Sequence, residues 1–422
     1  MSGKFAKPFV FTLTLCLAAH AANATIYTVS NLLDDGSAGT LRKAITDANG
    51  HVGLDDINFT VVGTITLGSA LPAITSPVNI NGNTAPGYAG SPLVEINGNG
   101  LTANGLFISA GDSTITSIGV RNFDGRGIYI GTNGNNTIQG CYIGTNLAGT
   151  AASPNTSDGV LISTTHNSIT TSVISGNGSN GVSISAGSDN SITSCFIGTN
   201  ANGTAALGNG SYGVRTFGPA TTIGGSTAGN VISANNRGIG LEADACLVVA
   251  NVIGTNAAGT AALGTQTAGI EVYGLSNTIG GTLASLRNLV SGNAGTGISV
   301  SGTADGTIVR GNYIGTNLAG TAALANTGVG IRIYGAKNTT VGGAVVAARN
   351  VVSGNGNRGI TIENGATGTL VQFNLVGTNA AGTAAIPNGG EGIQLAANGS
   401  TIGGAGVGNV VSGNSNHGIV VQ

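Results

Sequence analysis

Two glutamates and one arginine have the residue types and the spacing needed for acid–base chemistry on a sugar chain. Glu242 and Glu271 occupy outward positions on successive repeats, and Arg215 occupies an outward position on the repeat before them. If successive repeats are adjacent strands of a parallel sheet, the two carboxylates are offset by two residues and lie about 8 Å apart. That separation resembles the carboxylate pair of an inverting glycosidase. The three residues are therefore candidate catalytic residues of a polysaccharide lyase or hydrolase.

The same outward positions carry aromatic and charged residues that suit binding of a sugar without catalysis. These candidate ligand-binding residues are Phe217, Tyr273, Arg332, Tyr334 and Glu363. A third interpretation needs no ligand, because glutamate and arginine on adjacent strands form solvated ion pairs and tyrosine is common on exposed strands. Spacing alone does not choose between an acid–base pair, a sugar-binding strip and an ionic ladder.

Other kinds of site are not indicated. His51, His166 and His417 have no metal-ligand spacing, and Asp55-Asp56 falls outside the repeats. The calcium-binding nonapeptide Gly-Gly-x-Gly-x-Asp does not occur, and neither does the Asn-Thr-Asp, Asp-Asp and Gly-His-Gly set of polygalacturonases. We therefore expect no metal and no cofactor.

The elements that position these residues follow from a repeat. The phrase Ile-Gly-Thr-Asn, followed by a copy of x-x-Gly-Thr-Ala-Ala, starts at Ile143, Ile197, Ile253 and Ile314, and recurs with valine first at Val376. A finer repeat of Asn, two apolar residues, Ser or Gly, Gly or Thr, and then Asn occurs twice as often, with short and long units alternating. Stacked repeats of this kind bury their apolar faces against their neighbours.

Each unit contains three short apolar segments separated by Gly, Asn and Ser turns, which favours one turn of a parallel β-helix. We expect a single-stranded right-handed parallel β-helix of about 12–13 turns, roughly 60 Å long. The recurring asparagines should form hydrogen-bonded ladders, and the long units should project loops in a row along one side. The apolar residues expected to face inward and stack are Ile128, Ile130, Val182, Ile184, Ile270, Val272, Ile298, Val300, Ile331, Ile333, Ile360 and Ile362.

Two smaller sets of side chains follow from this register. Cys141 and Cys195 fall at equivalent positions two turns apart, about 9–10 Å, which is beyond disulfide reach. With Cys246 they are expected to be small buried residues. Phe107, Tyr129 and Leu161 form an outward apolar column that is either a partner surface or is covered by the projecting loops.

The ends of the chain differ from the repeats. Residues 1–24 read as a secretory signal peptide, with Lys4 and Lys7 before an apolar run and a small-x-small site at Ala22-Asn23-Ala24. Residues 25–92 form an N-terminal cap region with one helix over 40–49, because Thr40 suits an N-cap and Gly50 a stop. Residues 93–422 form the β-helix domain, and we expect its repeats to continue beyond Gln422.

The low charge of the chain limits which kinds of partner it can bind. Only 7% of residues are charged, and loss of two lysines with the signal peptide takes the formal charge from −2 to −4. Such a chain offers no basic face for nucleic acid, and no segment after the signal peptide is apolar enough to cross a membrane. An extracellular polysaccharide, or a host or cell surface, is the expected partner.

Several motifs resemble one known group. The segment from Asp34 to Asn49, the stretch from Ala70 through Gly98, and the two repeat phrases are similar to the CSLREA-type bacterial extracellular β-helix proteins. The motif that names the group reads Gly-Thr-Leu-Arg-Lys-Ala at 39–44 here, without its Cys and Glu. The resemblance implies a secreted or surface protein and carries no catalytic residues.

A unique catalytic cluster usually interrupts a repeat, and this chain keeps its repeat throughout. We therefore expect a secreted or cell-surface solenoid that is adhesin-like, structural or glycan-binding and not catalytic. The alternative is a polysaccharide lyase or glycoside hydrolase that acts on an acidic polysaccharide.

Overall fold

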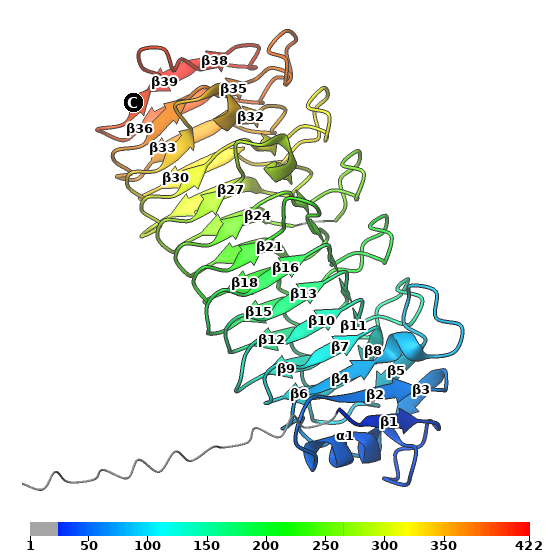
Figure 1. Ribbon diagram of the computed structural model, residues 1–422. Helices are drawn as coiled ribbons and strands as arrows, with labels where there is room; N and C mark the ends of the chain where they lie inside the picture. The colour runs from blue at the N-terminus through cyan, green and yellow to red at the C-terminus, as the bar shows by residue number, and fades with distance from the viewer. Residues whose placement is uncertain (1–23, 265) are drawn as a thin grey trace, which may run out of the picture.

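The computed structural model describes residues 24–264 and 266–422, which form a right-handed parallel β-helix shaped as a rod (Figure 1). The chain passes through three sheets in the order A, B, C, once per turn, and every strand pairs with its counterpart one turn away. The sheets contain 14, 13 and 12 strands, so the predicted fold and number of turns are confirmed.

Sheet A runs along one side of the rod and starts at the N-terminal end. Its strands are β1 (Ile26–Val29), β2 (Asp55–Phe59), β4 (Val78–Asn81), β7 (Thr114–Thr116), β10 (Thr137–Gln139), β13 (Ser168–Thr170), β16 (Ser191–Thr193), β19 (Thr222–Ile223), β22 (Leu247–Val248), β25 (Thr278–Ile279), β28 (Ile308–Val309), β31 (Thr340–Gly342), β34 (Leu370–Gln372) and β37 (Thr401–Ile402).

Sheet B follows a corner of about two residues, one of which often has a positive φ, as at Ser117 and Gly140. Its strands are β3 (Gly63–Thr66), β5 (Val94–Asn97), β8 (Ile118–Arg121), β11 (Tyr142–Ile143), β14 (Val173–Ile174), β17 (Phe196–Ile197), β20 (Val231–Ile232), β23 (Val252–Ile253), β26 (Leu289–Val290), β29 (Tyr313–Ile314), β32 (Val351–Val352), β35 (Leu375–Val376) and β38 (Val410–Val411).

Sheet C closes each turn and carries the candidate site residues. Its strands are β6 (Leu106–Ile108), β9 (Ile128–Ile130), β12 (Val160–Ile162), β15 (Val182–Ile184), β18 (Tyr212–Thr216), β21 (Arg237–Leu241), β24 (Ala268–Val272), β27 (Thr296–Ser301), β30 (Ile331–Tyr334), β33 (Ile360–Glu363), β36 (Ile393–Ala396) and β39 (Ile419–Val421).

The core is a stack of β-branched side chains. All twelve residues predicted to face inward from sheet C are fully buried, and each pairs in register with its counterpart, as Ile270 does with Ile298. Stiff, branched side chains suit this arrangement because they pack in layers with little loss of rotamer freedom. The inward alternation fixes the register, since a slip of one residue would expose every core side chain.

Buried asparagines form the predicted ladders. In one ladder, Asn288, Asn312 and Asn350 lie one turn apart, and each side-chain amide donates to the carbonyl oxygen of the next. The same oxygen also accepts from the backbone amide of the preceding asparagine. A second ladder runs through Asn155, Asn177, Asn209, Asn235, Gln266, Asn293, Asn326, Asn355, Asn388 and Asn414. These bonds satisfy backbone groups that the corners would otherwise leave unpaired inside the protein.

The predicted helix is α1 (Leu41–Asn49), and it lies at the N-terminal end of the rod beside β1 (Figure 1). The Thr40 side chain caps it by accepting from the backbone amide of Lys43, and Gly50 ends it. Leu41, Ala44, Ile45 and Ala48 are buried, so the helix covers the first turn as a cap. Three short 3-10 helices complete the structure: η1 (Gly82–Thr84), η2 (Ala284–Leu286) and η3 (Val346–Ala348). No helix in the described part of the chain is long and apolar enough to cross a membrane.

The five long loops form the expected row, and they also contact one another. They span residues 145–153, 199–207, 255–263, 316–324 and 378–386, each after a strand of sheet B (Figure 1). Backbone hydrogen bonds of 2.8 to 3.1 Å join each loop to the next, as from Ala257 to Gly203. Their glycines pack on outward rings of sheet B, as Gly149 does on Tyr142 and Gly203 on Phe196. The loop row therefore covers sheet B and leaves sheet C open.

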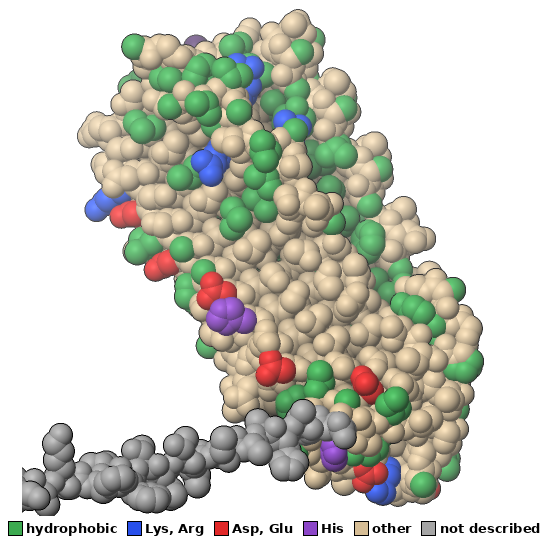
Figure 2. Space-filling model, viewed as in Figure 1, with side chains coloured by type: hydrophobic (Ala, Val, Ile, Leu, Met, Phe, Trp, Pro, Cys, Tyr) green, Lys and Arg blue, Asp and Glu red, His purple; other side chains and the backbone are tan. Residues whose placement is uncertain are grey.

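Among the residues that the structure describes, Cys141, Cys195 and Cys246 are free thiols and are buried, as predicted. Sheet A presents a different surface from sheet C. Its outward residues over β7 to β16 are mainly Thr and Ser, and the middle of the face seen in Figure 2 is largely tan, the colour of side chains that are neither charged nor hydrophobic. That face has few charged groups, so most of the charge of the β-helix lies elsewhere.

Candidate functional site

The outer face of sheet C brings the predicted site residues into two adjacent rows. In the first row, Arg215 pairs in register with Gly240, and Glu271 and Arg332 lie two and four turns from Arg215. The second row lies two residues further along each strand and contains Phe217, Glu242, Tyr273, Ser301, Tyr334 and Glu363. All eight residues proposed from the sequence therefore lie on one face.

Arg215 is at the centre of the first cluster. Its Nη2 and Nε donate to Oε1 of Glu242 at 2.8 and 3.2 Å. Its guanidinium lies over the ring of Phe217, 4.8 Å from the ring centre, and over that of Tyr212 at 5.2 Å. The Phe217 side chain is 46% exposed, so one large aromatic surface faces solvent beside a fixed arginine.

The second cluster repeats the first. Arg332 Nε donates to Oε1 of Glu363 at 2.6 Å, and its guanidinium lies 4.5 Å from the ring centre of Tyr334. In both clusters an arginine contacts the aromatic residue two positions on and the glutamate of the next turn. Tyr334 is 38% exposed. We call these two clusters the Arg215 station and the Arg332 station; four turns separate them, or about 19 Å.

Between the stations lies a third group around Glu271. The Tyr212 hydroxyl donates to Oε2 of Glu271 at 2.9 Å and accepts from Nη1 of Arg237 at 3.2 Å. Tyr273 donates to the other oxygen of Glu271 at 3.4 Å. Tyr212 reaches across the intervening turn because that turn has Gly240 there, and a Cβ at Gly240 would lie 2.8 Å from the tyrosine ring.

The electrostatics of this group favour the neutral tyrosine and the charged arginine. Burial and the nearby charge of Glu271 raise the pKa of Tyr212 from 10.0 to about 12. The same glutamate raises the pKa of Arg237. The phenol is therefore a hydrogen-bond donor at neutral pH, with its proton directed at a carboxylate.

Glu242 and Glu271 have the predicted offset of two positions on adjacent turns, and each makes its contacts with different residues. Glu242 accepts from Arg215, whereas Glu271 lies 3.5 Å from Nε of Arg237 and accepts from Tyr212. Each carboxylate is thus engaged by a separate arginine. Geometry of this kind suits structural or ligand-binding ion pairs better than a pair that shares a water molecule between two carboxylates.

Arginine–carboxylate pairs continue along the whole face. Besides the three pairs above, Arg126 lies 3.8 Å from Asp158, and Arg358 lies 2.6 Å from Glu391. In every pair the arginine belongs to one turn and the carboxylate to the next turn toward the C-terminus. The charges of these five pairs cancel, so this face is rich in charged groups without a large net charge.

The sequence interpretation missed Tyr212 and Arg237. If side chains alternate strictly along the strand, counting back two residues from the outward Arg215 places Gly213, and not Tyr212, on the outer face. In the structure, a Cβ at Gly213 would lie 2.5 Å from the side chain of Ile232, which is fully buried, so Gly213 faces the interior. Tyr212 and Arg237 pair with each other across the turns and take the outer positions. The available signal was a large side chain directly before a Gly-apolar pair, which is Tyr212 on one turn and Arg237 on the next.

The apolar column near the N-terminal end lies on sheet C and is not under the loop row. Phe107 and Tyr129 stack with ring centres 5.0 Å apart and planes at 11°. Gly131 makes room for the Phe107 ring, and Leu161 is buried. The column packs mainly on itself.

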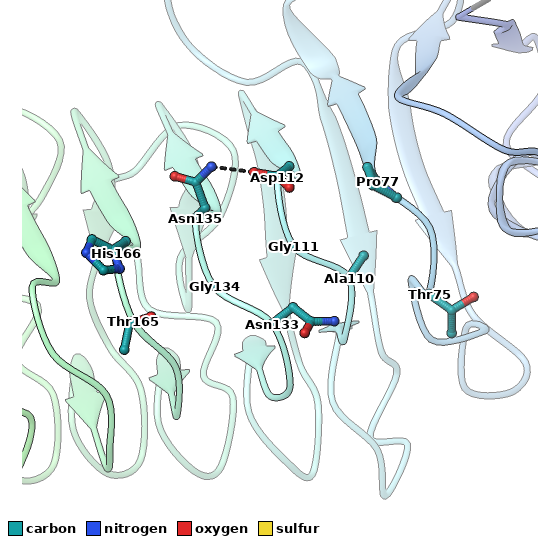
Figure 3. Close-up of a pocket in the computed structure, with 10 residues that line it drawn as sticks. All are labelled: Thr75, Pro77, Ala110, Gly111, Asp112, Asn133, Gly134, Asn135, Thr165 and His166. Carbon is teal, nitrogen blue, oxygen red and sulfur yellow. Dashed lines mark hydrogen bonds between the residues drawn. The ribbon is translucent and has the colours of Figure 1, made fainter. Parts of the chain in front are cut away.

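A separate open cavity of about 520 Å³ lies at the turns between sheets C and A (Figure 3). Its lining includes Asp112, Asn133, Asn135 and His166, and Asn135 donates to Asp112. His166 lies 3.8 Å from Asp189. No group of three or more His, Cys, Asp or Glu residues lies close enough to hold a metal ion within the described ranges. The cavity is lined mostly by small and amide side chains, so we do not place the candidate site there.

The chain matches no protein-family model and no curated protein. Among solved structures it is similar to the A-module of the mannuronan C-5 epimerase AlgE6 of Azotobacter vinelandii, at 13% identity and a TM-score of 0.46, with 90% of this chain and 93% of that chain covered. It is also similar to the catalytic unit of a GH87 α-1,3-glucanase from Streptomyces thermodiastaticus, at 14% identity and a TM-score of 0.41, with 94% and 70% covered. A mannuronic acid-specific family 6 polysaccharide lyase from human gut microbiota aligns at 16% identity and a TM-score of 0.39, with 94% and 83% covered. These are β-helix proteins, and at such identities and TM-scores the site must be interpreted from its own residues.

Proposed function

We propose that the outer face of sheet C binds an extended polysaccharide, and that the protein is a secreted or cell-surface solenoid whose role is binding. The observation that carries the proposal is the duplication of one arrangement, Arg-x-aromatic with a glutamate on the next turn, at the Arg215 and Arg332 stations. A duplicated station on a straight sheet suits a ligand that itself repeats.

The stations have the features that a sugar ring needs. Phe217 and Tyr334 offer exposed aromatic faces, and the paired arginine and glutamate beside each offer fixed hydrogen-bond donors and acceptors. Because each arginine is already held by a glutamate, little side-chain freedom is lost when a ligand binds. A polysaccharide long enough to contact both stations binds with higher affinity, because the second contact forms intramolecularly once the first is made.

The cancelled charges of this face bear on the ligand. An acidic polysaccharide would have to compete with a carboxylate for every arginine of the five pairs. We therefore expect stacking and neutral hydrogen bonds to dominate the binding, and salt to weaken it only slightly, unlike binding to a strongly basic surface.

A second candidate function is cleavage of an acidic polysaccharide, and the group around Glu271 favours it. Tyr212 holds a hydroxyl between Arg237 and Glu271, an arrangement that can pass a proton. In a lyase, a base removes the proton next to a sugar carboxylate while an arginine neutralises that carboxylate. The electron pair forms a carbon–carbon double bond, and the glycosidic oxygen leaves and takes up a proton from an acid. Against this, Tyr212 is only 4% exposed, and its pKa of about 12 makes the phenol a weak acid at neutral pH.

One experiment separates the two candidates. Purified protein is tested for binding to immobilised neutral and acidic polysaccharides at low and high salt, and the same polysaccharides are assayed for unsaturated products and new reducing ends. Binding without turnover supports the proposed function. Turnover that is lost in Glu271→Gln or Tyr212→Phe, with binding retained, would replace it by the second candidate.

The place of the protein outside the cell is part of the proposal. It is supported by the apolar N-terminal segment with its Ala22-Asn23-Ala24 site and by the motifs shared with the CSLREA-type group. Membership of that group is likewise proposed, on the repeat phrases and the segment from Asp34 to Asn49. Detection of the protein in the culture medium or on intact cells tests the location.

A further inference from the structure

A buried carboxylate at the N-terminal end of the rod has only one of its two oxygens paired. Asp55, the first residue of β2, has a side chain with no exposed area. Its Oδ1 lies 2.9 Å from the backbone nitrogen of Thr25 and 2.9 Å from Nδ1 of His51. Its Oδ2 is buried and has no partner in the described part of the chain. A buried carboxylate in this condition is costly unless a positive charge compensates it.

The backbone nitrogen of Thr25 is held in place by the fold. β1 begins at Ile26, which pairs in register with Asp56, and the Asp56 amide donates to the Thr25 carbonyl at 2.9 Å. The Thr25 side-chain oxygen also lies 3.4 Å from Nε2 of His51. The contacts that position this nitrogen against Asp55 therefore all come from residue 25 and later residues, and they do not need the residues before it.

Among the described residues, the charged groups around Asp55 do not supply a permanent cation. On α1, Lys43 is paired with Asp47 at 2.5 Å. On β2, Asp56 adds a further negative charge and accepts from the amides of Asn79 and Asn81. His51 is charged only when protonated. Burial, followed by the charges of Asp55 and Asp47, raises the pKa of Tyr27 on β1. The site thus has an excess of negative charge.

The sequence indicates how a positive charge can arise on the nitrogen of Thr25. Ala22-Asn23-Ala24 is a small-x-small cleavage site, and the residue after it is Thr25. We infer that cleavage of the Ala24–Thr25 bond by a signal-peptidase-type protease creates an α-ammonium that pairs with buried Asp55 and completes the cap. The hydrolysis consumes one water molecule, leaving a carboxylate on Ala24 and an amino group on Thr25 that is protonated. This inference rests on the proposed export and is independent of polysaccharide binding.

The position of the cleaved bond matters because the positive charge must lie on the nitrogen of Thr25, the atom that contacts Asp55. An amide nitrogen at Thr25 offers a single proton to Oδ1, whereas an ammonium has three and can also serve Oδ2. Cleavage one residue earlier would leave the amide in place and move the charge by about one residue length, roughly 3.8 Å. The site therefore distinguishes a chain that starts at Thr25 from one that starts at Ala24.

The pairing has a defined pH dependence. An α-amino group has an ordinary pKa of about 7.7–8.0, and an ion pair with a buried carboxylate raises it in the folded protein. The added stability is then fully present below about pH 7.7 and is lost as the pH rises through the raised folded value.

The test uses two matched chains that both lack the signal peptide, one starting at Thr25 and one at Ala24. Each is made with and without Asp55→Asn by removing an N-terminal tag with a protease that leaves the stated first residue. We expect the Thr25 chain to melt at a higher temperature than the Ala24 chain at pH 6.5, and this difference to shrink above pH 9 and to vanish in the Asp55→Asn pair. We also expect the α-amino group of the Thr25 chain to react with an amine reagent at pH 6.5 about tenfold more slowly than that of the Ala24 chain, which is the factor that a pKa raised by one unit gives at a pH well below the pKa.

Equal melting temperatures and equal amine reactivity in the two chains would overturn the inference. If Asp55→Asn does not fold, the amine reactivity of the two unsubstituted chains still decides it. N-terminal sequencing of the exported protein should begin at Thr25, and any other first residue would also overturn it. None of these results depends on whether a polysaccharide binds.

Discussion

Replacing Tyr212 by phenylalanine removes two hydrogen bonds from the centre of the sheet C face without opening a cavity. The hydroxyl donates to Glu271 at 2.9 Å and accepts from Arg237 at 3.2 Å, while the ring lies over Gly240 and stays there in the variant. A hydrogen bond to a charged group contributes about 1.5–3 kcal/mol. The side chains of Arg237 and Glu271 are 48% and 16% exposed, so water can replace part of the loss. We expect the free energy of unfolding to fall by about 1–2 kcal/mol in total.

The assay is urea unfolding followed by circular dichroism, with amide hydrogen exchange in β21 and β24 as the local measurement, because solenoids can unfold turn by turn. Tyr273→Phe is the matched control, since its hydroxyl makes one long bond of 3.4 Å to the same glutamate. It should change the stability by less than about 0.5 kcal/mol. Equal stabilities of Tyr212→Phe and the unsubstituted protein, or an equal loss in both variants, would refute this reasoning.

The pKa of Tyr212 gives the same prediction a second measurement. Its folded value of about 12 lies above the ordinary 10.0, so the linked stability is complete below pH 10 and is lost as the pH rises toward 12. In a titration of tyrosinate absorbance, Tyr212→Phe should remove the component that titrates last. Loss of a component near pH 10 instead would contradict the burial of this phenol in the folded protein.

Two further predictions concern the core. Asn312→Ala should lower the free energy of unfolding by at least about 3 kcal/mol, because it removes the side-chain oxygen that accepts from the buried Asn288 backbone and side-chain amides, and the donor to the Asn350 side chain. Asn236→Ala, at an exposed position, should change it by less than about 0.5 kcal/mol. Urea unfolding of both variants checks this, and similar losses would argue against the ladder. The thiols of Cys141, Cys195 and Cys246 should resist a thiol reagent at pH 8 in the folded protein and all react after unfolding without reductant, because burial raises their pKa values to about 11, 12 and 11. Fewer than three reactive thiols in the unfolded, unreduced chain would contradict the assignment of free cysteines.

The fold follows from the sequence to an unusual depth because one turn repeats. The recurring asparagines Asn288, Asn312 and Asn350 mark the same position in successive turns. Counting from them identifies inward residues such as Ile298 and Ile331, which are buried in the structure. The helix over 41–49 also follows, since its cap and its apolar spacing are local signals. Repetition makes the long-range pairing readable from local spacing.

The finer features depend on contacts that alternation does not encode. Gly213 and Gly238 each precede an inward apolar residue and break the alternation, so counting from Arg215 does not find Tyr212 and Arg237, the residues that pair with each other and surround Glu271. The sequence indicated a row of loops but gave no sign that Gly203 bonds to the next loop and that the loops cover sheet B. The pairing of Asp55 with Thr25 joins residues 30 apart and needed the register of β1 and β2.

The most direct test of the proposed function is the effect of the two station aromatics on polysaccharide binding. Phe217→Ala and Tyr334→Ala are compared with Leu370→Ala, a similarly exposed apolar residue on sheet A, using a polysaccharide that the unsubstituted protein retains in an affinity gel. Each station variant should weaken binding about fivefold or more, from a loss of about 1 kcal/mol or more per aromatic contact, and the double variant should weaken it further. Leu370→Ala should bind as the unsubstituted protein does. Unchanged binding in the double variant, or binding lost equally in Leu370→Ala, would contradict the assignment of the sheet C face as the binding surface.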